Sequence, residues 1–302
     1  MKHTSGSSLP TLGILLAGDR SYPSFAAFCG RMHDLGYRDG QNIRFVSRFA
    51  EGRLAELPAL AAELVEGGAQ LIAVVGAVTF FAVRKVAPEV PVVFSIVLDP
   101  VEAGLVKDAM RPGGHATGST SFDPGQTAAQ IRLLAMAVPG LKRLAILGDA
   151  GVPAILPKLA RAAAEAAGIE PHVFLLGSEA DLAPAFREFA DRGAEALLCL
   201  EVPRTTTYGA EIVAMANAAR LPAIFGRDHA RYRPLLAYGT SLAAAAARMA
   251  AQADAVLKGA DPGELPIEYV AAPELVIDVG VAERLGIELA PELVASAAQL
   301  LR

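Results

Sequence analysis

The chain has 302 residues, of which 53% are hydrophobic and 20% are charged, and its formal net charge is -5. This length allows two α/β domains of ordinary size, each with its own core. The acidic balance argues against a nucleic-acid partner, because phosphate recognition needs a basic face. No apolar run reaches the roughly 18 residues that a membrane-spanning helix needs.

The N-terminus and the cysteine and histidine residues carry no special motif. Residues 1–10 lack the apolar core of a signal peptide, so the chain is expected to be cytoplasmic or to have lost an export signal. Cys29 and Cys199 lie far apart in sequence and are predicted to be buried free thiols. The histidines are scattered without metal-ligand spacing, so neither a metal nor a cofactor is expected.

Short apolar runs alternate with longer amphipathic stretches in the first part of the chain. In the stretch 54–66, apolar residues recur at helical spacing on one face, namely Leu57, Leu60, Ala61 and Leu64. Such alternation is typical of a parallel sheet with helices on both faces. Strands are predicted at 12–17, 42–49, 70–75 and 90–96, and helices at 24–35, 54–66 and 78–87.

The alternation then begins again, without close sequence similarity to the first part. Helices are predicted at 127–137, 155–167, 181–192 and 210–219, and strands at 143–147, 172–176, 196–200 and 222–225. A long helix at 243–258, a turn at Asp261–Gly263, an alternating stretch at 267–279 and helices at 281–285 and 291–301 follow. We expect these late elements to complete the two halves and not to form a third domain.

The sequence therefore predicts an α/β protein with two doubly wound parallel-sheet lobes joined by a multi-strand hinge. The N-terminal lobe would take residues 9–122 and 240–268, and the C-terminal lobe residues 123–239 and 269–302. The chain would cross between lobes near Phe122, near Gly239–Leu242 and near Tyr269. Several crossings make a hinge that bends without unfolding either lobe.

Ligands of open parallel sheets bind at the loops that follow the carboxyl ends of the strands. Gly76 and Ala77 let the backbone approach a ligand, and Thr79 lies in the first turn of a helix whose free N–H groups attract a carboxylate. Glu201 follows an apolar strand and can receive an ammonium group. The candidate ligand-binding residues are Asp19, Arg20, Tyr22, Gly76, Ala77, Thr79, Asp99, Ser121, Phe122, Asp149, Glu201, Tyr208, Arg227 and Asp228.

Each of these residues also has a purely structural interpretation. Thr79 can cap its own helix, Asp99 can begin a turn, and Glu201 can be a solvated loop acid. Arg227 and Asp228 can form ion pairs at the surface. The aromatic candidates Tyr22, Phe122 and Tyr208 can belong to the core. Nucleotide-binding motifs and a serine-nucleophile elbow are absent from the sequence, so no catalytic residue is predicted.

Several stretches together resemble a known family. They are Met32–Tyr37 with Arg38–Ile43, Leu57–Val65, Leu98–Val101 with Gly104–Val106, Arg111–Gly114 before Thr117–Gly118, Leu221–Ile224, Tyr238–Gly239, and Pro273–Asp278 with Leu285–Gly286. The chain is similar, over roughly residues 11–300, to ABC-transporter substrate-binding proteins of the type I periplasmic fold, including TrpX-like members.

The resemblance implies a monomeric, exported receptor that gives a small solute to a membrane permease in the periplasm. Its ligand loops would fall at Gly76–Thr79, Asp99, Ser121–Phe122, Glu201 and Arg227–Asp228. The ligand would be an aromatic or amino-acid-like carboxylate, and the protein would not be an enzyme. Two alternatives remain at this point: a cytoplasmic ligand-binding regulator with the same two-lobed fold, and a two-lobed α/β enzyme.

Overall fold

The computed structural model describes residues 9–97, 99–120, 125–270 and 273–302. The chain divides into two compact units. Unit 1 comprises Met1–Phe122 and Ala243–Val270, and unit 2 comprises Asp123–Leu242 and Ala271–Arg302. No helix in the described ranges combines the length and apolarity needed to cross a bilayer.

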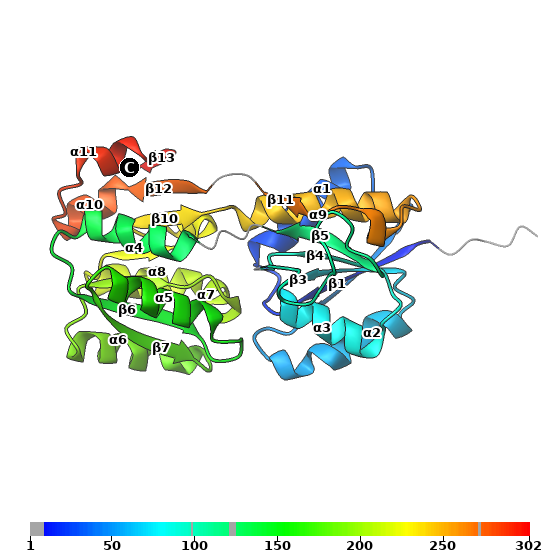
Figure 1. Cartoon of the computed structure of the whole chain (residues 1–302), viewed down its shortest axis with the longest axis horizontal. Helices are drawn as coiled ribbons and strands as arrows, with labels where there is room; N and C mark the ends of the chain where they lie inside the picture. The colour runs from blue at the N-terminus through cyan, green and yellow to red at the C-terminus, as the bar shows by residue number, and fades with distance from the viewer. Residues whose placement is uncertain (1–8, 98, 121–124, 271–272) are drawn as a thin grey trace, which may run out of the picture. The chain divides into compact units, whose positions relative to one another are not determined.

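Unit 1 is a six-stranded sheet whose paired strands are all parallel, in the order β11-β5-β4-β3-β1-β2. Successive residues of β1 serve opposite faces, with Leu15 in one core cluster and Ile14 in the other. Helices α2 and α3 cover the first face, and α1 and α9 cover the second (Figure 1). The strands are β1 (Thr11–Leu16), β2 (Arg44–Phe49), β3 (Leu71–Val75), β4 (Val92–Ser95), β5 (Ala116–Thr120) and β11 (Glu268–Tyr269), and the helices are α1 (Pro23–Asp34), α2 (Leu57–Glu66), α3 (Ala77–Val86) and α9 (Leu242–Leu257), with short 3-10 helices η1 (Leu54–Glu56) and η4 (Pro262–Glu264).

Unit 2 is a seven-stranded sheet in the order β13-β12-β10-β9-β8-β6-β7. Its pairs are parallel except for β10 with β12. Helices α4 and α5 pack on one face, and α6 and α8 pack on the other (Figure 1). The strands are β6 (Arg143–Asp149), β7 (Glu170–Leu176), β8 (Ala196–Cys199), β9 (Ala223–Phe225), β10 (Leu236–Gly239), β12 (Glu274–Asp278) and β13 (Gln299–Leu301), and the helices are α4 (Gln126–Ala137), α5 (Ile155–Ala166), α6 (Leu182–Asp191), α7 (Pro203–Thr207), α8 (Gly209–Ala218), α10 (Val279–Leu285) and α11 (Pro291–Ala295), with 3-10 helices η2 (Glu179–Asp181) and η3 (Arg227–Tyr232).

The predicted fold class, two mostly parallel α/β sheets, is confirmed, but one predicted helix is wrong in its second half. The stretch 291–301 was expected to be helical throughout. In the structure α11 ends at Ala295, and Gln299–Leu301 forms β13 beside β12. Pairing of Ile277 with Leu300 extends the sheet by one strand at this edge. Backbone hydrogen bonds to a neighbouring strand thus override the local helical preference of a short terminal segment.

Candidate functional site

The loop after β1 holds Asp19, Arg20 and Tyr22 in contacts within unit 1. The Asp19 carboxylate accepts hydrogen bonds from the backbone N–H of Ser21 at 2.7 Å and from its hydroxyl at 2.6 Å. The Arg20 guanidinium lies 5.6 Å from the ring centre of Phe25. Tyr22 is buried in the core cluster beneath α1. The loop therefore follows a strand, as predicted, while the Tyr22 side chain is part of the hydrophobic core.

The N-terminus of α3 keeps its backbone accessible, but its threonine is occupied. Gly76 has a φ of +84°, and no atom lies within 4 Å of the position that a Cβ would take there. No side chain caps α3. The fully buried Thr79 hydroxyl donates to the carbonyls of Val75 at 2.6 Å and Gly76 at 2.7 Å. The Gly76 N–H donates to the Ser95 carbonyl at 2.9 Å. The N–H groups of the first turn of α3 from Ala77 onward, rather than the Thr79 hydroxyl, are therefore the candidate groups for a carboxylate.

Asp99 begins a turn, in agreement with its structural interpretation. Its Oδ1 accepts hydrogen bonds from the backbone N–H groups of Val101 at 2.9 Å and Glu102 at 3.0 Å. These bonds make it the first residue of a turn. The two further candidates of this unit, Ser121 and Phe122, lie outside the described residues.

Asp149, at the end of β6, is a buried anchor for α7. Its side chain is 1% exposed. One carboxylate oxygen accepts from the backbone N–H of Arg204 at 2.9 Å, and the other accepts from Gly151 N–H at 2.7 Å and pairs with the Arg204 guanidinium. All these partners belong to the protein, so Asp149 positions the loop after β8.

Replacing Asp149 with alanine is therefore expected to destabilise the protein by about 3 kcal/mol, because the Arg204 guanidinium and two backbone N–H groups lose their acceptor. Urea denaturation measures this change. Exposed Asp191 in the same unit provides the control, and D191A should stay within about 0.5 kcal/mol of wild type. A loss for D149A no larger than that of D191A would contradict the anchoring role.

Glu201 lies just beyond β8, where it meets His229 of η3. The Glu201 side chain is 12% exposed and that of His229 is 4% exposed. Glu201 Oε1 is 4.0 Å from His229 Nδ1. Gly226 leaves room for the carboxyl group, since a Cβ on that residue would lie 2.0 Å from Glu201 Oε1. The β8 and β9 carboxyl ends thus bring an acid and an imidazole into one buried cluster.

Several buried polar atoms of this cluster have no hydrogen-bond partner in the described part of the protein. Eight buried side-chain N and O atoms in the described part of the chain have no hydrogen-bond partner. Five of them belong to four residues here, namely Glu201 Oε1, Thr206 Oγ1, Thr207 Oγ1 and both ring nitrogens of His229. Buried polar atoms are normally paired, so such a concentration indicates a place completed by water or by a ligand.

Burial sets the protonation states of the pair. Burial first, and the charge of Asp228 second, raise the pKa of Glu201 to about 8. Burial lowers the pKa of His229 to about 4. At neutral pH the acid therefore holds its proton and the imidazole is neutral. A cation brought to this point would favour ionisation of the acid.

The remaining candidates of unit 2 surround this cluster. Asp228 is half-buried on η3 and acts on Glu201 through its charge. Tyr208 is half-buried and packs against the core cluster under α8. The Arg227 guanidinium pairs with Glu274 at 3.0 Å, which matches its structural interpretation as an ion pair. The candidate residues predicted from the sequence do not include His229, Thr206, Thr207 or Gly226, although the loops Glu201–Thr207 and Gly226–His229 both follow predicted strands.

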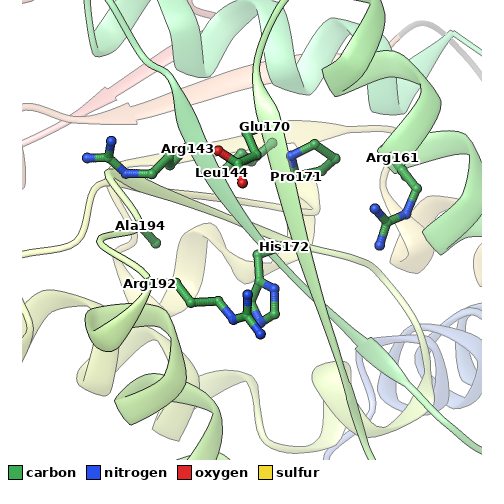
Figure 2. Close-up of a pocket in the computed structure, with 8 residues that line it drawn as sticks. All are labelled: Arg143, Leu144, Arg161, Glu170, Pro171, His172, Arg192 and Ala194. Carbon is green, nitrogen blue, oxygen red and sulfur yellow. The ribbon is translucent and has the colours of Figure 1, made fainter.

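A separate hollow of about 460 Å³ opens at the opposite edge of the unit 2 sheet, where β6 and β7 begin (Figure 2). Its arginine and histidine side chains already have acidic partners. Arg143 pairs with Glu195 at 2.7 Å, and both His172 and Arg192 lie against Glu188. Among the described residues that line it, only His172 has a buried side-chain atom without a hydrogen-bond partner, and that Nε2 lies 2.8 Å from Glu188 Oε1. Its lining residues are Arg143, Leu144, Arg161, Glu170, Pro171, His172, Arg192 and Ala194.

The described part of the chain offers no group of three or more His, Cys, Asp or Glu side chains placed to hold a metal ion. Cys29 and Cys199 are both free thiols; Cys199 is buried as expected, whereas Cys29 is half-buried. Burial raises the pKa of the Cys199 thiol, so it stays protonated.

Residues 15–301 match the family of ABC transporter substrate binding proteins. The chain belongs to this family. A tyrosine-binding protein of Clostridioides difficile (strain R20291) is 30% identical over 95 residues, which is 32% of this chain. The match spans only 28% of the length of that curated relative.

Solved structures share the whole fold at low sequence identity. A conserved domain protein from Vibrio cholerae O1 biovar eltor str. N16961 has a TM-score of 0.86 and 22% identity, covering 97% of this chain and 100% of that chain. An ABC domain from Streptococcus pneumonia in complex with L-Trp has a TM-score of 0.85 and 20% identity, with the same coverage. The predicted family resemblance, the type I periplasmic-binding-protein-like fold and the prediction of a binding protein rather than an enzyme are confirmed.

Proposed function

We propose that this protein is the periplasmic receptor of an ABC importer and that it captures an aromatic amino acid for delivery to a membrane permease. The observation that carries the proposal is the buried, unsatisfied polar cluster of Glu201 and His229 at the carboxyl edge of the unit 2 sheet. Membership of the substrate-binding family supports the transport role. The names of the tyrosine-binding relative and of the structure in complex with L-Trp support the ligand class.

The proposed ligand binds at loops that follow the carboxyl ends of parallel strands. Its ammonium group binds Glu201, beside Asp228, through charge-assisted hydrogen bonds. The candidate groups for its carboxylate are the N–H groups of the first turn of α3, from Ala77 onward. The aromatic ring packs near Tyr208. The ligand favours whichever form of the protein binds it more tightly, and that form would be presented to the permease.

Calorimetric titration with L-tyrosine and L-tryptophan tests the ligand class. We expect saturable binding of one ligand per chain by at least one of the two. Tyramine, which lacks the carboxylate, and the deaminated analogue of tyrosine, which lacks the ammonium group, should each bind about 30-fold more weakly or worse, because each has lost the charge-assisted hydrogen bonds of one end of the ligand. Absence of heat with both amino acids would refute an aromatic amino-acid ligand.

A further inference from the structure

The Glu201–His229 pair differs from the other acid–histidine contacts of this chain in its burial. The carboxyl and imidazole groups are 4.0 Å apart, which is too long for a direct hydrogen bond. In contrast, His115 and Glu89 form an exposed pair, with side chains 47% and 83% exposed. Water screens the exposed pair, whereas the buried pair feels every change of charge nearby.

Few groups close to Glu201 can compensate a negative charge. Asp228 has the same sign, and the buried Cys199 thiol remains neutral. Arg231 is exposed, lies 4.5 Å over the Tyr232 ring and disfavours protonation of His229. The Arg204 guanidinium is committed to Asp149. Among the described residues, the charged and titratable groups that act on the pair or contact it are Cys199 from β8 and Asp228, Arg231 and Tyr232 from η3.

Threonine hydroxyls from α7 complete the surroundings without adding charge. Thr206 and Thr207 each have a buried hydroxyl oxygen with no partner. Gly209 of α8 lies against the His229 ring, where a Cβ would be 2.7 Å from Cδ2. The ring is therefore held in place, and it cannot swing away to make room for an ionised carboxylate.

We propose that Glu201 loses its proton when it binds the ligand's ammonium group, so that ligand binding releases one proton to the solvent. The carboxyl O–H bond breaks, and the proton passes to a buffer base. The carboxylate oxygen then accepts a hydrogen bond from an N–H group of the ligand's ammonium. This inference rests on the proposed function. It adds that the ligand must be cationic at this subsite and that affinity depends on pH.

The direction of the pH dependence follows from which state holds the proton. The free protein holds it and the complex does not, so raising the pH favours the complex. Since the pKa of Glu201 is about 8, affinity should rise between about pH 6 and about pH 8, by up to about tenfold per pH unit. Above this range, Glu201 is already ionised in the free protein and the affinity should level off.

Calorimetry with L-tyrosine or L-tryptophan at pH 7, in phosphate and in Tris, counts the protons. These buffers differ in ionisation enthalpy, so the difference in observed heat gives the number released. A value near one supports the proposal. Binding with a value near zero overturns it while leaving the proposed function intact. Absence of binding by both amino acids refutes the proposed function and removes the ammonium subsite with it.

A ligand-free measurement isolates the proton on Glu201. Infrared difference spectra of the protein near pH 6.5 and pH 9.5 should contain a protonated carboxyl band that disappears at the higher pH and is lost in E201Q. E211Q, which removes an exposed acid on α8, should retain the band. Absence of this band from the wild-type protein near pH 6.5 would overturn the proposal. If E201Q does not fold, the wild-type pH titration of the band gives the same decision.

Discussion

Substituting Glu201 with glutamine is expected to weaken binding of the aromatic amino acid by on the order of 100-fold, because the ammonium group loses a charge-assisted hydrogen bond in a buried position. Glutamine keeps the length of the side chain and its carbonyl oxygen. The change therefore removes the ability to carry a negative charge with little disturbance of packing. Calorimetric titration of the variant beside wild type measures the effect.

Folding stability separates this loss of affinity from damage to the fold. The folded-state pKa of Glu201, about 8, lies above its ordinary value of 4.5. Ionisation therefore favours the unfolded chain, and wild type loses stability as the pH rises through this window. E201Q has no such loss, so relative to wild type it should gain urea resistance near pH 9 and change little near pH 5.

The control for charge is E211Q, which also removes one acid from unit 2 but at an exposed position. It should bind the amino acid with the affinity of wild type. If E201Q and E211Q bind equally well, the ammonium group does not lie at Glu201. If E201Q is destabilised near pH 9, the carboxyl group has a stabilising partner that the buried cluster does not show.

Sequence position was enough to find Glu201 but not its surroundings. An acid directly after an apolar strand such as Ala196–Cys199 falls at the carboxyl edge of a parallel sheet, and this follows from topology alone. His229 belongs to the cluster because the turn at Gly226 and the close approach of Gly209 bring its ring beside β8. Neither glycine lies in a local sequence pattern that predicts such a contact, so the sequence did not place the imidazole beside Glu201.

The competing structural interpretations could not be separated from sequence, since they involve the same side chain in the same place. Thr79 at the start of α3 was equally suited to a ligand and to its own backbone, and the structure shows the second. The same holds for Asp99 and its turn. For Asp149, the deciding partner is Arg204, which lies far along the chain and reaches it only through the fold.

Strand β5 was absent from the predicted elements because its sequence, Ala-Thr-Gly-Ser-Thr, lacks an apolar run. It is nevertheless completely buried between β4 and β11. Its hydroxyls find partners inside unit 1: Ser119 donates to the Ala245 carbonyl at 2.7 Å, and Thr117 donates to the Leu265 carbonyl at 2.8 Å. Polar residues can thus occupy a central strand when helix and loop carbonyls accept their hydrogen bonds.

Gly118, in the middle of β5, has less room for a Cβ atom than Gly13, the other glycine in the strands of this sheet. A Cβ built on it would lie 2.3 Å from the backbone oxygen of Phe94 and 2.6 Å from its ring. Gly118 pairs with Phe94 in the register of β4 and β5. The phenylalanine ring is completely buried in a core cluster between the sheet and α3. Relief of the clash would therefore need movement of a strand, because no flexible chain end is involved.

Replacing Gly118 with alanine is accordingly expected to destabilise the protein by about 3 kcal/mol, at the upper end of the cost of overpacking a core. Gly30 supplies the matched control, since it is exposed on α1 and a Cβ there meets no atom within 4 Å. G30A should instead gain about 0.5 to 1 kcal/mol from the higher helix propensity of alanine. Urea denaturation of the two variants beside wild type compares the same chemical change at both sites. Equal stability of G118A and wild type would mean that β4 and β5 can separate at no cost, which contradicts the packing of Phe94 against this strand.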